Sequence, residues 1–287
     1  VSKNFAKHFL LKEEHSDLHD SGMIHIHDLD FYAMGTLTCC QINLSKLFKD
    51  GFSTGHGSLR EPKDISSYTA LAAIAIQSNQ NDQHGGQSIP AFDFDMSEGV
   101  RKSFKKILDY ECEILEDQFD KDTLNTLSQF ELESLNLEEL KDDSMRKVLE
   151  RVYKQTIKKT YQAMEALIHN LNTMHSRAGA QVPFSSLNFG TDTSHAGRIV
   201  IEQLLLAHES GLGNHETPIF PILIFKIKEG VNFNPQDPNY DLFRLALRVS
   251  SKRLFPNFSF LDAPFNAKYY KVNQVETEVT YMGCRTR

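Results

Sequence analysis

The feature that most constrains the fold is an alternation of strand-like and helix-like segments that begins at Val182. Apolar runs at 182–190, 218–227 and 255–262 are separated by helix-like runs at 197–213 and near 240–251. Alternation of this kind predicts parallel strands that are joined by crossover helices. We expect Thr193 and Ser194 to cap the first of these helices.

Two further segments complete the expected sheet. Residues 35–43 are rich in Thr, Leu, Ile and Cys and fit a short buried strand, and residues 275–284 alternate apolar and polar side chains. With the three runs above they give about five strands. The predicted class is therefore α/β, and five strands suit half of a large barrel as well as an open sheet.

The remaining regular structure is expected to be helical. Residues 68–77 are small and apolar on every face, which is typical of a helix buried between layers, and Ser66 and Ser67 are its candidate caps. Apolar residues at helical spacing in 100–172 predict two or more long helices, broken near 120–136. We treat 1–287 as one partial domain with a helical subregion at about 99–173.

Charge and hydropathy exclude several classes of partner. The net charge is −7, from 31 basic and 38 acidic residues, and no dense basic run offers the stripe that nucleic-acid binding requires. No stretch approaches the ~18 apolar residues of a membrane span, and the first residues lack the apolar core of a signal peptide. We expect a cytoplasmic protein that binds neither nucleic acid nor membrane. Because the sequence starts at Val1 and stops after a strand-like run, we also expect a piece of a longer chain.

Cysteine is the residue type with the most chemical potential in this sequence. The four cysteines are too few and too scattered for a disulfide framework, so free thiols are expected; they are Cys39, Cys40, Cys112 and Cys284. Cys284 follows a glycine and precedes two arginines, which predicts a thiol presented on a turn, although an incidental free cysteine fits its position equally well. Cys39 and Cys40 are neighbours on a strand and point to opposite faces, so at most one can face a given site.

Three polar motifs have both a functional and an ordinary interpretation. His25 and His27 would share one face of an extended segment, but a metal would need further ligands, so hydrogen-bonded pocket histidines are favoured over a metal site. The glycine-containing run at 83–87 lacks the lysine and the spacing of a phosphate loop. Residues 191–194 could receive a phosphate at a helix start, yet ordinary capping is favoured.

Taken together, five segments resemble the anaerobic, glycyl-radical class of ribonucleoside-triphosphate reductases. They cover almost the whole chain in the expected order: HIHDLDFY with TCCQINLSKLFKDGF, STGHGSLREPKDI, AAIAIQSNQNDQHGGQSIP, HSRAGAQVPFSSLNFGTDTS and YMGCRT. The resemblance implies the first half of a ten-stranded α/β barrel, in which a central loop carries a cysteine.

The resemblance also implies roles for individual residues. Cys284 matches the loop cysteine that becomes a thiyl radical and abstracts the ribose 3′ hydrogen. A second cysteine on the first strand takes part in reduction of the 2′ carbon. Counting back to the histidines favours Cys40 for this role, whereas matching the residues that follow favours Cys39. Met282 and His25 resemble residues that line the substrate pocket.

Effectors, cofactors and partners follow from the same resemblance. Glu61 and Lys63 resemble part of a specificity site, where a deoxynucleoside triphosphate at a dimer interface selects the base to be reduced. The family uses a glycyl radical, a four-cysteine zinc site, an ATP-binding module upstream, a radical-SAM iron–sulfur activating enzyme and, in many members, formate. The radical glycine, the zinc ligands and the ATP module are expected outside these 287 residues, so we expect this segment alone to be inactive, and we assign no metal to it.

Two other functions remain open on the sequence. One is another glycyl-radical enzyme, such as a pyruvate formate-lyase-like acyltransferase, whose reactive thiols stand side by side on the central loop. The other is a nucleotide-binding regulatory fragment without a catalytic role. The isolated position of Cys284 on its loop favours the reductase over the acyltransferase.

Overall fold

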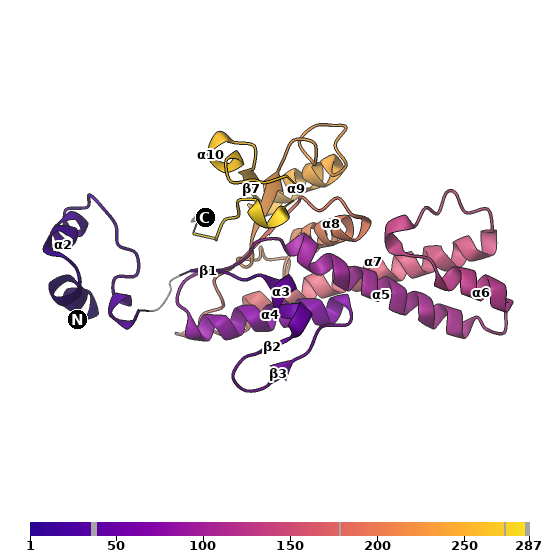
Figure 1. The fold of residues 1–287 in the computed structure, drawn as a ribbon, viewed down its shortest axis with the longest axis horizontal. Helices are drawn as coiled ribbons and strands as arrows, with labels where there is room; N and C mark the ends of the chain where they lie inside the picture. The colour runs from indigo at the N-terminus through magenta and orange to yellow at the C-terminus, as the bar shows by residue number, and fades with distance from the viewer. Residues whose placement is uncertain (36–38, 178, 273, 285–287) are drawn as a thin grey trace.

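The centre of the molecule is a five-stranded sheet in which every neighbouring pair of strands is parallel (Figure 1). The computed structural model describes residues 1–35, 39–177, 179–272 and 274–284. The strand order is β1-β4-β5-β6-β7, so strands that follow one another in the chain lie side by side. The strands are β1 (Cys40–Gln41), β4 (Gln87–Ile89), β5 (Ser185–Phe189), β6 (Ile222–Ile227) and β7 (Asn257–Phe260).

Helices of very different lengths lie between and after these strands. They are α3 (Leu44–Asp50), α4 (Ile65–Asp82), α5 (Phe92–Ile114), α6 (Lys121–Ser128), α7 (Asp143–Thr173), α8 (His195–Ser210), α9 (Tyr240–Arg253) and the short α10 (Pro264–Ala267). Figure 1 shows α5 and α7 running away from the sheet to α6 at the far end. Short 3₁₀ turns occur at Leu132–Ser134 and Val275–Thr277, and a two-stranded hairpin, β2 (Phe52–Ser53) with β3 (Ser58–Leu59), lies between α3 and α4.

The N-terminal residues form a small helical unit at one end of the molecule (Figure 1). It contains α1 (Ser2–Phe5), a π-helical turn (Ala6–Leu10), α2 (Glu13–Asp20) and a 3₁₀ turn (Tyr32–Met34). One contact with the rest of the chain is a stack between the rings of Phe31 and His84, whose centroids are 3.8 Å apart.

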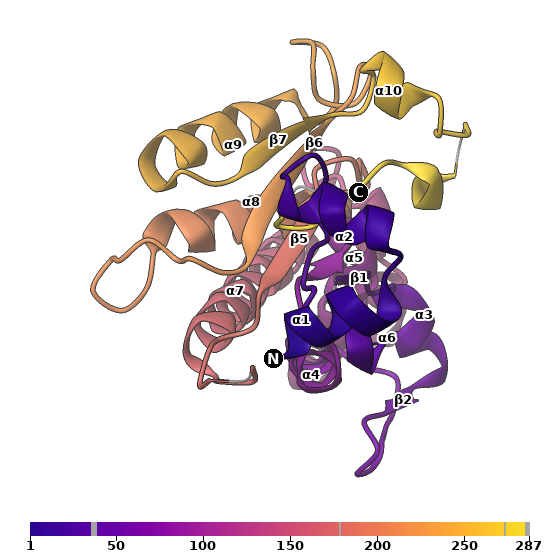
Figure 2. The same cartoon turned by 90° about the vertical axis from the view of Figure 1, so that its left-hand side faces the viewer.

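The two faces of the sheet differ in polarity. Alternate residues of β5 and β6 belong to the apolar core under the helices, among them Leu187, Phe189, Leu223 and Phe225. Figure 2 shows α7, α8 and α9 stacked on this side of β5 and β6, with the end of the chain on the other side. The intervening residues point away from the helices, as the two-residue period of a strand requires. We call this second side the inner face and define it by Ser88, Asn188 and Lys226, which all bond the segment 274–284.

Most of the expected elements are confirmed. The runs at 182–190, 218–227 and 255–262 contain β5, β6 and β7, and the helices between them are α8 and α9. Ser194 caps α8, accepting the N–H of Gly197 at 3.0 Å. The long helical region is α5, α6 and α7, and its break lies where the sequence placed it.

The expectation of a strand at 275–284 is wrong, and a strand at 87–89 was missed. The described part of 275–284 starts with a 3₁₀ turn and then lies across the inner face without pairing as a strand. Its alternation arises because the polar residues Glu278 and Thr280 are both buried, although the segment is not a strand. Strand β4 escaped notice because Gln87 and Ser88 are polar, although both are fully buried.

Helix α4 also differs from its expectation in two respects. Its N-cap is Asp64, whose carboxylate accepts the N–H of Ser67 at 3.0 Å, so neither Ser66 nor Ser67 is the cap itself. The helix is not buried on every face, since the side of Ala70 and Ile74 is exposed. Small residues here allow close packing on one side only.

Candidate active site

Two cysteines that lie far apart in the sequence meet at the inner face. The Sγ atoms of Cys39 and Cys284 are 3.8 Å apart, although 245 positions separate the residues. Cys39 directly precedes β1, and Cys284 ends the segment that crosses the sheet. The structure therefore brings the loop cysteine next to one member of the vicinal pair.

The other member of the pair faces the helices. The thiol of Cys40 donates to Oε1 of Gln87 at 3.0 Å and accepts from the amide of Asn79 on α4 at 3.0 Å. Alternation along the strand forces this division, because Cys39 and Cys40 cannot both point to the inner face. The structure thus favours Cys39 over Cys40 as the partner of Cys284.

Close backbone approach explains the glycines beside these sulfurs. The N–H of Gly86 points at Sγ of Cys39 at 3.3 Å. A Cβ on Gly283 would lie 2.7 Å from Cδ1 of Ile222 and 3.2 Å from the ring of Phe184. Gly283 is needed because the chain lies directly on these two side chains, which brings Cys284 close to the sheet.

Both members of the vicinal pair are held as thiols. Burial raises the pKa of Cys39; the Gly86 N–H opposes this shift, and the neighbouring Cys284 thiol adds to it. Burial also raises the pKa of Cys40, against a smaller lowering by the Asn79 amide. Each sulfur therefore keeps its hydrogen at neutral pH, which suits hydrogen-atom transfer better than nucleophilic attack.

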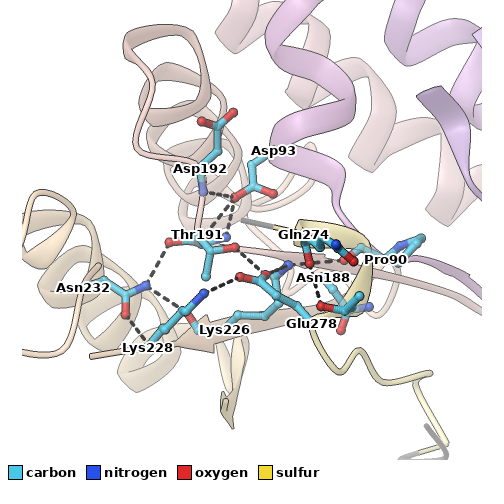
Figure 3. A network of polar contacts seen from close by, with 12 residues as sticks. Pro90, Asp93, Asn188, Thr191, Asp192, Lys226, Lys228, Asn232, Gln274 and Glu278 are labelled. Carbon is cyan, nitrogen blue, oxygen red and sulfur yellow. Dashed lines mark hydrogen bonds and ion pairs between the residues drawn. The ribbon is translucent and has the colours of Figure 1, made fainter. Parts of the chain in front are cut away.

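A cluster of buried charged residues holds the segment 274–284 against the sheet. Oε2 of Glu278 accepts from Nζ of Lys226 at 2.7 Å and from the hydroxyl of Thr191 at 2.8 Å, and Oε1 pairs with Lys228 at 3.2 Å (Figure 3). Burial would raise the pKa of Glu278, but the charge and hydrogen bond of Lys226, together with Thr191 and Lys228, outweigh it and lower that pKa. Glu278 is thus a buried carboxylate with three partners.

Replacing Lys226 by methionine is expected to destabilise the fold. The side chain of Lys226 has 0% exposure, and its loss leaves a buried carboxylate with one cation fewer, which costs ~3 kcal/mol of unfolding free energy. Urea unfolding of the full-length protein measures the change. Lys252→Met is the matched control, because Lys252 pairs with Glu209 at the surface and should cost less than ~1 kcal/mol. Equal losses in the two variants would contradict the role of the buried pair.

The backbone N–H groups of the turn after β5 and of the start of α8 already bond to carboxylates of the protein. Oδ2 of Asp93 accepts the N–H groups of Gly190, Thr191 and Asp192 at 2.8–3.0 Å. At the start of α8, Glu133 accepts the N–H of His195 at 2.7 Å. The ordinary capping interpretation of 191–194 is therefore confirmed, since protein carboxylates occupy the positions that a phosphate would need.

The two residues that resemble pocket-lining residues lie in different surroundings. Met282 is buried two positions before Cys284. His25 is exposed on the N-terminal unit, where its ring lies 5.6 Å from that of His19 and 5.9 Å from that of His27. The described ring contacts of His25 are therefore with two other histidines of the N-terminal unit. In the described parts of the chain, no group of three or more His, Cys, Asp or Glu residues is placed to hold a metal ion.

Glu61 and Lys63 lie in a separate groove between the β3–α4 connection and α5. The groove has a volume of about 1000 Å³. Basic residues outnumber acidic ones along its walls: Arg60, Lys63, Lys102, Lys105 and Lys106 against Glu61, Asp109 and Glu113. Glu61 pairs with Lys102 at 2.5 Å, which fixes one wall.

Several residues at the inner face escaped the sequence analysis. Lys226 stands within an apolar strand and Glu278 within an alternating run, and a charge inside an apolar pattern was the available signal for both. Ser88 and Asn188 gave no such signal, because polar residues of ordinary kinds occur throughout the neighbouring segments. No helix of the described residues is long and apolar enough to span a bilayer.

This fold is found in a known class of enzymes. The fold aligns with the anaerobic ribonucleotide reductase of Thermotoga maritima solved with dATP bound in the specificity site. The TM-score is 0.56 at 14% identity, and the alignment covers 88% of this chain and 38% of that chain. The fold is therefore that of part of an anaerobic ribonucleotide reductase barrel.

The sequence gives the particular family. The family described as anaerobic ribonucleoside-triphosphate reductase matches residues 1–287, and the chain belongs to it. The enzyme of Haemophilus influenzae is 32% identical over 90% of this chain and 32% of its own length. That of Enterobacteria phage T4 is 29% identical over 100% of this chain and 41% of its own. The chain thus spans about a third to two fifths of these relatives.

Proposed function

We propose that this chain is the part of an anaerobic ribonucleoside-triphosphate reductase that holds both thiols of the reaction. The full-length enzyme would reduce ribonucleoside triphosphates to deoxyribonucleoside triphosphates by radical chemistry. The observation that carries this proposal is the 3.8 Å separation of the Cys39 and Cys284 sulfurs. Membership of the family supports the substrate class.

The two thiols would act in sequence. Cys284 would give its hydrogen atom to a glycyl radical of the full-length enzyme, which would supply the unpaired electron. The sulfur of Cys284 then abstracts the 3′ hydrogen of the ribose. Cys39 takes part in the reduction at the 2′ carbon that follows, and its raised pKa keeps the sulfur protonated at neutral pH.

The remaining cofactors and partners are proposed on the family alone. A radical-SAM iron–sulfur enzyme would activate the full-length protein, and formate is the candidate external reductant. The active form would be a homodimer in the cytoplasm. The zinc site, the radical glycine and any ATP-binding module would belong to other parts of the full-length chain.

The groove at Glu61 and Lys63 is the proposed effector site. A triphosphate requires several cations, and the groove offers five basic side chains. Among the described residues, Arg60 and Lys63 have no ion-pair partner, so both are available to a phosphate. A relative of the same fold binds dATP in its specificity site, which supports a deoxynucleoside triphosphate here.

Reversing the charge at Lys63 is expected to weaken effector binding. Lys63→Glu puts a carboxylate where a phosphate would bind and should raise the dissociation constant of dATP about tenfold. Isothermal titration of the full-length enzyme measures it. Lys154→Glu is the control, because Lys154 is exposed on α7, outside the groove, and the change in net charge is the same. An equal loss in both variants, or none in Lys63→Glu, would place the effector elsewhere.

The structure bears on the acyltransferase alternative. That reaction needs two adjacent thiols on the central loop, whereas here the partner of Cys284 comes from the start of β1 and the next residue in the sequence is Arg285. The arrangement favours the reductase. A regulatory fragment would instead bind dNTP while Cys284→Ser left the turnover of the full-length activated enzyme unchanged.

Anaerobic activation of the full-length enzyme tests the proposed function. We expect CTP to be converted to dCTP once the glycyl radical has been detected by electron paramagnetic resonance. A protein that carries the radical and binds CTP but forms no dCTP would overturn the proposal.

A further inference from the structure

The side chain of Asn188 makes two hydrogen bonds to the backbone of the segment that carries Cys284. Its Oδ1 accepts the N–H of Tyr281 at 2.9 Å, and its Nδ2 donates to the carbonyl oxygen of the same residue at 2.9 Å. A side-chain amide here makes both hydrogen bonds that a neighbouring strand would have made. Asn188 therefore replaces strand pairing at a position where segment 274–284 does not join the sheet.

A residue of the neighbouring strand β4 also hydrogen-bonds the Tyr281 backbone. The hydroxyl of Ser88 donates to the Tyr281 carbonyl oxygen at 3.0 Å, and Nδ2 of Asn188 lies 3.0 Å from Oγ of Ser88. Asn188 has 0% exposure, as has Ser88. Water cannot replace these bonds at so buried a place, so their loss leaves polar groups unpaired.

The hydrogen bonds of Asn188 to Tyr281 lie close in sequence to Cys284. Tyr281 lies three residues before Cys284, and Gly283 between them lies against Ile222 and Phe184. The Lys226–Glu278 pair fastens the same segment three residues before Tyr281. Of these two sets of contacts, the one at Tyr281 is nearer to Cys284 along the chain. A displacement of the Tyr281 backbone should therefore also displace the Cys284 sulfur.

We propose that Asn188 is a positioning residue that holds the Cys284 sulfur within reach of the Cys39 sulfur. The proposal rests on the proposed function for its purpose, since hydrogen-atom transfer in one pocket requires both sulfurs near one nucleotide. Asn188 touches neither thiol in the contacts described and acts through Tyr281. Its strand places it on the inner face, two register steps beyond the row of Gln41 and Ser88.

The test measures how readily the two sulfurs meet. In the full-length enzyme without activation, diamide accepts two hydrogen atoms while the thiols of Cys39 and Cys284 form one S–S bond. Peptide mass spectrometry quantifies that disulfide over time. Asn188→Leu, of similar size, removes both bonds to Tyr281 and should slow its formation about tenfold. Ser88→Ala removes the bond to the Tyr281 carbonyl oxygen and the contact with Nδ2 of Asn188, and it should slow disulfide formation about threefold.

Asn239→Leu is the matched control. Asn239 is also fully buried, and its amide donates to the carbonyl oxygen of Asp192 at 2.9 Å, but it has no contact with Tyr281 in the structure described. It should lose stability without slowing the disulfide more than about twofold.

Either of two results would overturn the proposal: crosslinking of Asn188→Leu at the parent rate, or an equal slowing in Asn239→Leu. If Asn188→Leu does not fold, an unchanged rate in Ser88→Ala is the overturning result. The crosslinking needs no radical, so a failed reductase assay would count against the proposed function and leave this inference standing.

Discussion

Replacing Cys284 by serine in the activated full-length enzyme is expected to abolish nucleotide reduction. The loss should be at least about 1000-fold, because an O–H bond is too strong to give its hydrogen atom to a glycyl radical as the S–H bond of cysteine does. The variant should still bind CTP and dATP, since a serine hydroxyl is close in shape to a thiol. Anaerobic turnover of CTP, together with nucleotide titration, separates the two effects.

Cys112→Ser is the control for this prediction. Cys112 lies on α5, is partly buried and packs against the apolar core, so its thiol is remote from the inner face. Its replacement should leave turnover within about twofold of the parent. Persistent reduction by Cys284→Ser would remove Cys284 from the reaction altogether.

The second large effect distinguishes the two neighbouring cysteines. Cys39→Ser should lower the turnover of CTP at least about 100-fold, because the thiol beside Cys284 would no longer supply hydrogen to the reaction. Cys40→Ser should leave turnover within about twofold, since a serine hydroxyl at this position can still bond Gln87 and Asn79 on the helix side. The pair differs by one position along the chain, so each variant controls for the other.

The opposite pattern would contradict the structure. If Cys40→Ser were inactive and Cys39→Ser active, the register of β1 against β4 would have to shift by one residue. Such a shift would move Cys40 to the inner face and break the pairing of Cys40 with Gln87.

The sequence predicted the strands β5, β6 and β7 correctly, but it did not predict β4 or the structure of 275–284. Strands β5, β6 and β7 were recognisable because apolar runs between helices are typical of a buried parallel sheet. Strand β4 was not, because its polar side chains are satisfied by partners that are distant in the sequence, such as Tyr281 for Ser88. The run at 275–284 imitated a strand because a buried glutamate alternates with apolar residues there.

The candidate site was predictable as a pair but not in its orientation. Alternation showed that only one of Cys39 and Cys40 could face Cys284, and two ways of matching the neighbouring residues gave different answers. The choice depends on how β1 pairs with β4, which no local pattern encodes. The placement of Asn188 opposite Tyr281 likewise depends on long-range register, so sequence reasoning had no means of finding it.

Alkylation of the thiols in the full-length enzyme tests the central claim most directly. The claim is that Cys39 and Cys284 border one nucleotide pocket. CTP at a saturating concentration, added together with dATP, should slow the reaction of iodoacetamide with both Cys284 and Cys39. The rate of alkylation of Cys112 should stay unchanged. Unaltered alkylation of Cys284 in the presence of bound CTP would contradict the account.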